Sequence, residues 1–232
     1  MVMAEGRFHE SMDQKPSVMA EFMRFLGYLM LPTVLLVAAA VAGFLDRSTP
    51  VSLFGSLSFT GLRFDPGPWF SMGHVWVFAL FMVVNLTGRR HGASVAFAAV
   101  AAAGALLVLV WAYAAYGDAH IIMPADMIAA LSNQTMVLAV ALSVMVGLLV
   151  NIVVFDLVRG RPWWKAPLLA PLFGGATMVG LFHGLAGDAL AGTYADKVVS
   201  HFVIVVLATL LMLVVYHALR SIIQPRSGYG GA

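Results

Sequence analysis

The sequence contains no cysteine. Disulfide bonds, thiolate metal sites and cysteine nucleophiles are therefore excluded together. Charged residues are also scarce, at 10% of the chain against about 25% in ordinary soluble domains, and 61% of the residues are hydrophobic. This composition excludes a water-soluble globule. The net charge of +2 comes from thinly spread cations and does not indicate a nucleic-acid partner.

Charged side chains are missing from the interior of the long apolar runs. Charged residues inside a membrane usually mark ion paths and proton relays. A carrier that couples to protons or sodium through a buried acid is therefore not expected. Hydrolase, kinase and dinucleotide-binding motifs are also absent from the sequence, so we predict neither an enzyme nor a cofactor.

Apolar runs of about 20 residues are what the sequence does contain, and such a run spans the hydrocarbon core as a helix. We predict six spans, at residues 25–45, 69–87, 93–116, 133–155, 166–185 and 198–223. They form one transmembrane domain (25–223) between an N-terminal tail (1–24) and a C-terminal tail (224–232). The fold class is all-α, a polytopic membrane protein. Residues 46–68 are too short and too rich in Gly and Ser to span, and we expect them to lie at the interface or to fold back as a partial hairpin.

The distribution of cations gives the orientation. Ten of the 13 Lys and Arg residues fall on one side of the six-span topology: nine in the two tails and in the second and fourth connections, and Arg220 close to the end of the last span. Lys and Arg concentrate in cytoplasmic loops. Both termini are therefore predicted to be cytoplasmic.

The fourth connection and the start of the fifth span read RGRPWWKAPLLAPLFGG, residues 159–175. Three cations surround Trp163 and Trp164, and an apolar run with two prolines and two glycines follows. The topology makes residues 159–165 a tight cytoplasmic turn. Amphipathic indole rings prefer the headgroup level, so the two tryptophans are predicted to anchor its rim.

Neutral polar residues do occur inside the spans, chiefly Asn85, Thr87, Asn151 and Thr177. Such side chains often bond to a neighbouring helix, which is an ordinary packing use of polar groups in membranes. They are also the side chains available to bind a solute. The residues by themselves leave both interpretations open.

Four histidines, His74, His183, His201 and His217, lie in three different spans. Imidazole ligates haem iron, copper and zinc. These histidines form no i, i+3 or i, i+4 pair, and no carboxylate accompanies them. Haem or metal binding is therefore kept as a third candidate, behind histidines bonded to a backbone carbonyl or a headgroup.

The fifth span contains GLFHG, in which Gly180 and Gly184 form a small-xxx-small pattern. This pattern permits close helix approach. The alanine-rich third span (93–116) is the predicted partner within the chain. A homodimer interface fits the pattern equally well.

Two motifs together resemble the queuosine-precursor transporter family, the vitamin-uptake-like membrane proteins that take up 7-deazaguanine bases. The first, NLTGRRHG at 85–92, looks like the family's Asp-Leu-Thr-x-Arg-x-x-Gly. The second, NIVVFDLVRGRPWWKAPLLAPLFGG at 151–175, is similar to an Asp-x-x-Val-Phe helix end, a basic turn, Trp-Trp, Ala-Pro and Leu-Phe-Gly. The resemblance covers residues 72–180.

The resemblance implies a small-solute transporter of the bacterial inner membrane. Arg89 would pin the second span at its end, and the four polar residues at 85, 87, 151 and 177 would bind the solute. The family's aspartate falls on Asn85, and family positions rich in polar residues fall on Leu168, Ala170, Pro171, Gly175 and Met178. A site that loses such partners loses orders of magnitude in selectivity. Altered or lost base selectivity is therefore expected, and the alternative is a non-transporting subunit or assembly factor docked to a larger membrane complex.

Overall fold

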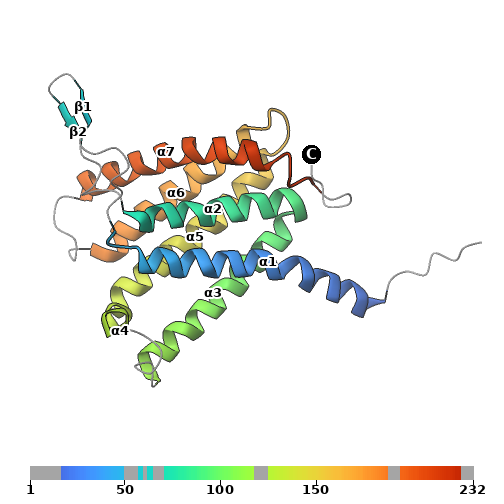
Figure 1. Cartoon of the computed structure of the whole chain (residues 1–232), viewed down its shortest axis with the longest axis horizontal. Helices are drawn as coiled ribbons and strands as arrows, with labels where there is room; N and C mark the ends of the chain where they lie inside the picture. Colours follow the sequence, from blue (N-terminus) through green and yellow to red (C-terminus); the bar gives the residue numbers. More distant parts are fainter. Residues whose placement is uncertain are drawn as a thin grey trace, which may run out of the picture.

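The structure is a computed structural model that describes residues 17–49, 57–59, 62–64, 71–117, 125–187 and 194–225. Six of its helices are long and apolar enough to cross a membrane, which confirms the predicted fold class. These helices are α1 (Val18–Leu45), α2 (Met72–His91), α3 (Ala93–Tyr116), α5 (Gln134–Val158), α6 (Lys165–Ala186) and α7 (Tyr194–Leu219), as Figure 1 shows. A short helix, α4 (Ala125–Ser132), precedes α5. The chain is an integral membrane protein, and the side that its termini face stays a prediction.

Capping residues set helix ends that hydrophobicity does not reveal. The N-cap Ser17 accepts a hydrogen bond from the Ala20 amide (3.2 Å), so α1 begins inside the predicted tail. An N-cap oxygen satisfies one of the amides that the first helical turn leaves open. Helix α2 continues beyond the predicted end of its span at Thr87 and ends at His91, where the following Gly92 has a φ of 87°. Glycine adopts this left-handed conformation without the steric cost of a Cβ.

The connection between α1 and α2 contains a small antiparallel hairpin. Its strands are β1 (Leu57–Phe59) and β2 (Leu62–Phe64), with Leu57 opposite Phe64. The prediction that residues 46–68 fold back as a partial hairpin is confirmed for these strands.

The central helix of the bundle is α2. Half of its most apolar segment (50%) is buried, against at most 33% in the other five spanning helices. It is also the least hydrophobic of the six, with a mean hydropathy of 1.2. The least hydrophobic of the spanning helices is therefore the one that the other helices shield most from lipid.

A close backbone contact joins α5 to α6 through facing glycines. A Cβ on Gly174 would lie 2.5 Å from the carbonyl oxygen of Gly147 and 2.9 Å from the Cβ of Asn151. Small residues let helix backbones approach in this way. The predicted close approach at Gly180 and Gly184 is wrong within this chain, because a Cβ at either position would meet no atom within 4 Å.

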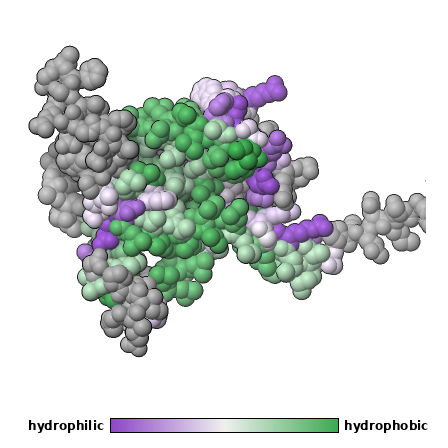
Figure 2. Space-filling model, viewed as in Figure 1, coloured by the Kyte–Doolittle hydropathy of each residue, from purple (hydrophilic) through white to green (hydrophobic). Residues whose placement is uncertain are grey.

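The predicted pairing of the third and fifth spans is also wrong. Helix α6 packs mainly on α5 and α7, whereas α3 packs on α1, α2 and α5. The reason is that the small residues facing α6 are on α5, not on α3. In Figure 2, hydrophobic residues cover the middle of the visible face, and most hydrophilic residues gather toward its right-hand and left-hand ends. That distribution suits a bilayer with polar surfaces at both ends of the helices.

Candidate functional site

The most buried polar contact of the described chain is an asparagine pair at the centre of the bundle. The Nδ2 of Asn151 on α5 donates to the Oδ1 of Asn85 on α2 at 2.8 Å. Asn151 is 0% exposed and Asn85 is 3% exposed. Within the described residues, the Oδ1 of Asn151 accepts no hydrogen bond. A buried polar atom of this kind is costly unless something bonds to it, so Asn151 retains the capacity to accept a bond from a ligand or water.

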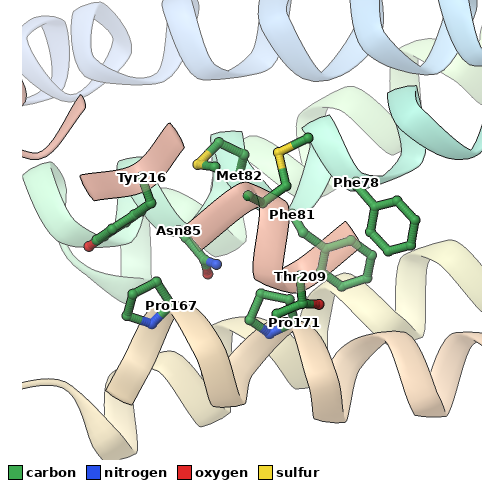
Figure 3. A pocket seen from close by; sticks show the side chains of 9 residues that line it. Phe78, Phe81, Met82, Asn85, Pro167, Pro171, Thr209 and Tyr216 are labelled. Atoms are coloured by element: carbon green, nitrogen blue, oxygen red, sulfur yellow. The ribbon is translucent and has the colours of Figure 1, made fainter. Parts of the chain in front are cut away.

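Asn85 also faces a small cavity enclosed by α2, α6 and α7 (Figure 3). Its polar lining consists of Asn85, Thr209 and Tyr216, and its walls include Phe78 and Pro171. The volume open to the centre of a water-sized sphere is about 10 Å³. One water molecule requires roughly 10–15 Å³ of such volume. In this conformation the cavity therefore admits water but not a heterocyclic base.

Thr209 adds a hydroxyl with unused bonding capacity at the cavity. It is 1% exposed, and its Oγ1 has no hydrogen-bond partner among the described residues. Tyr216 lies seven positions further along α7, and residues spaced by two helical turns share one face. Neither residue was predicted as a site residue. The signal available in the sequence was two polar side chains on one face of an otherwise apolar last span.

Two of the predicted solute-binding residues bond within their own helices. The hydroxyl of Thr87 donates to the carbonyl of Val83 at 2.7 Å, and that of Thr177 donates to the carbonyl of Phe173 at 2.9 Å. This i to i−4 bond is a common way for threonine to satisfy itself in a helix. Neither threonine lines the cavity. Of the four residues predicted to bind solute, the structure brings together only Asn85 and Asn151.

The arginine-rich end of the bundle is held by aromatic and backbone contacts. Arg89 donates from Nε to the carbonyl of Ile223 at 3.2 Å, which ties the end of α2 to the turn that follows α7. The guanidinium of Arg220 lies 4.2 Å from the ring centre of Trp163. Trp164 is 43% exposed. The two tryptophans therefore differ: Trp163 packs against the protein, and Trp164 faces outward as an interfacial anchor does.

Three of the four histidines meet at the opposite end of the bundle. The Nε2 of His183 on α6 lies 2.8 Å from the Nδ1 of His201 on α7, and the ring of His74 on α2 is 5.4 Å from that of His201. His217 lies apart from them, 4.7 Å from the Trp163 ring. Among the described residues no group of three His, Asp or Glu side chains is placed to hold a metal ion. The structure adds no support to the haem or metal candidate.

Comparison of the chain with protein-family models, with curated proteins and with solved structures finds no match. The resemblance to the queuosine-precursor transporters stays a prediction.

Proposed function

We propose that this integral membrane protein transports a small neutral solute through the interface of α2, α6 and α7. The observation that carries the proposal is the convergence of Asn85, Thr209 and Tyr216 on one cavity in the middle of the bundle. Polar groups inside a membrane are expensive, and they commonly mark a substrate path. No Asp, Glu, Lys or Arg of the described residues lines this cavity, so the solute is expected to be uncharged.

The chemistry of the lining favours a solute with adjacent donors and acceptors. A carboxamide both donates and accepts, and a hydroxyl does the same. The edge of a planar heterocycle offers this combination, and 7-deazaguanine is the base that the family resemblance implies. The aromatic and proline walls supply apolar surface for the faces of such a ring.

The water-sized cavity makes the described conformation an occluded one under this proposal. Binding a base requires α6 and α7 to move apart from α2, as helices do in alternating access. The kink-prone Pro171 on α6 and the short side chain of Thr209 on α7 lie where that separation would begin.

Ligand-induced stabilisation of the purified chain tests the proposal. A ligand at about 100 times its dissociation constant stabilises the folded state by about 2.7 kcal/mol. We expect 7-deazaguanine to raise the midpoint of thermal unfolding in nanodiscs, and Thr209→Val to reduce the shift. Thr177→Val is the matched control, because Thr177 lies outside the cavity and bonds only to its own helix. An equal shift in Thr209→Val and the parent would contradict the assignment of the site.

The second candidate is a non-transporting subunit of a larger membrane complex. The observation that favours it is the small volume of the cavity, about 10 Å³. This candidate predicts that purification in a mild detergent brings down a stoichiometric partner. Recovery of the chain alone or as a homodimer counts against it.

A further inference from the structure

The histidine cluster joins the three helices that also enclose the cavity. His74 lies in the first turn of α2, His183 in the last turn of α6, and His201 near the start of α7. His74 precedes the cavity residue Phe78 by one turn of α2, and His201 precedes the cavity residue Thr209 by about two turns of α7. A change at the cluster therefore acts on the same helices whose separation would open the cavity.

The contact between His183 and His201 limits how many protons the two rings can hold. Their facing nitrogens are 2.8 Å apart, and the ring centres are 4.7 Å apart. A hydrogen bond between two imidazoles needs one N–H and one lone pair. Two neutral rings meet this requirement, and one added proton converts the bond to a charge-assisted one. A second added proton places N–H groups on both facing nitrogens and breaks the bond.

His74 is held in a different role. Its Nδ1 accepts from the backbone amide of Ser71 at 3.2 Å, which is one half of a capping box at the start of α2, and it also lies 3.0 Å from the Ser71 hydroxyl. Protonation of Nδ1 would remove the lone pair that this cap uses. The ring meets that of His201 edge-on, with an interplanar angle of 65°. His74 is therefore neutral while it caps α2. A positive charge on His201 would lie directly beside its ring.

Other charged groups described at this end are engaged elsewhere. Asp46, at the end of α1, accepts from the indole of Trp76 at 2.8 Å, and the adjacent Arg47 donates to the carbonyl of Phe44 at 2.9 Å. The first half of α5, which packs against α6, contains no ionisable side chain. On α7 the sequence places Asp196 and Lys197 ahead of the histidine, and their side chains lie outside the described part of the chain.

We propose that His183 and His201 form a proton-binding site that clamps the end of α6 to the start of α7. The clamp is closed when both rings are neutral and when the pair has taken up one added proton, and uptake of a second added proton releases it. No Asp or Glu is buried among the described side chains of the spans, and this site provides a titratable group there. Its link to solute movement rests on the proposed function, whereas the proton site itself does not.

Distance measurement across the clamp tests the proposal without any solute. The chain has no cysteine, so spin labels attach only at introduced sites. Leu185→Cys and Val199→Cys place them on exposed positions next to the pair, since these residues are 46% and 62% exposed. In nanodiscs, pulsed electron paramagnetic resonance should show longer distances as the pH falls from about 8 to about 4, across the range in which histidine titrates. An unchanged distance distribution over this range overturns the clamp.

A matched pair of variants assigns the response. His201→Gln in the labelled chain should abolish the change in distance with pH, and His217→Gln, at the other end of the bundle, should keep it. An equal pH response in both variants and the parent would overturn the assignment to His201.

Nitrogen NMR of the labelled histidines in the otherwise unaltered chain gives a second measurement that does not depend on a variant's folding. We expect scalar coupling across the bond between the two rings and two separate proton-binding steps for the pair. Independent titration of His183 and His201 without coupling overturns the proposal. Because neither measurement uses a solute, failure here leaves the proposed transport function standing, and absence of transport leaves the proton site standing.

Discussion

The bond between Asn85 and Asn151 offers a quantitative test of the packed core. Both side chains are buried, and a single 2.8 Å bond joins α2 to α5. Leucine has nearly the shape of asparagine without its polar atoms. Asn85→Leu leaves both polar atoms of Asn151 without a partner, because its Oδ1 already lacks one among the described residues. Asn151→Leu leaves only the single Oδ1 acceptor of Asn85.

Two magnitudes follow from this difference. An unsatisfied buried polar group costs about 1–3 kcal/mol, so both single variants should be less stable than the parent, and Asn85→Leu should be the less stable of the two. Interhelical hydrogen bonds in membranes average about 0.6 kcal/mol and reach about 1.7 kcal/mol. The double variant should regain at least that coupling energy, since replacing both partners by apolar groups of the same shape is nearly neutral.

The assay is a double-mutant cycle on unfolding in detergent micelles, followed by tryptophan fluorescence or by near-ultraviolet circular dichroism. We expect a free energy of unfolding in the double variant that exceeds the additive value by about 0.6–1.7 kcal/mol. Additive single effects would refute the reasoning, because they would mean that the two asparagines do not depend on one another.

Two further stability predictions come from the glycine contact and from the basic turn. Gly174→Ala should destabilise the fold by about 1–3 kcal/mol, because the new Cβ would lie 2.5 Å from a carbonyl oxygen of α5; Gly180→Ala, with no atom within 4 Å, is its control in the same thermal unfolding assay. Equal midpoints would contradict the close contact of α5 and α6. Trp163→Ala should lower the midpoint by removing a cation–π contact worth about 0.5–2 kcal/mol, whereas Trp164→Ala should leave unfolding in detergent almost unchanged, and the reverse order would show that the two rings are wrongly placed.

The sequence predicted where the helices lie along the chain better than it predicted which helices pack together. Each apolar run became a helix because a backbone inside a membrane must satisfy its own hydrogen bonds. The pairing of α5 with α6 was missed, because a helix that is apolar on every side has no amphipathic pattern to show which face packs against the protein. Gly147 and Gly174 decide the pairing, and each is ordinary when considered by itself. Gly180 and Gly184 form the more obvious motif and make no such contact.

Only part of the candidate site was predicted, because the sequence does not show which polar side chains meet a neighbouring helix. Asn85 and Asn151 stood out as amides in apolar spans, and a carboxamide cannot satisfy both its polar ends on its own helix as simply as a hydroxyl can. Thr87 and Thr177 stood out equally, yet each hydroxyl bonds to a carbonyl one turn earlier. The histidine pair at 183 and 201 spans two helices, and linear spacing carries no information about such a meeting.

Uptake into proteoliposomes tests the central claim of solute transport through the polar centre most directly. The measurement compares labelled 7-deazaguanine accumulation by the parent chain and by the double variant Asn85→Leu with Asn151→Leu, which should remain folded. The account predicts saturable uptake by the parent and loss of that uptake in the double variant at equal stability and equal reconstitution. Equal uptake by the two proteins, or no uptake above empty liposomes by the parent, would contradict it.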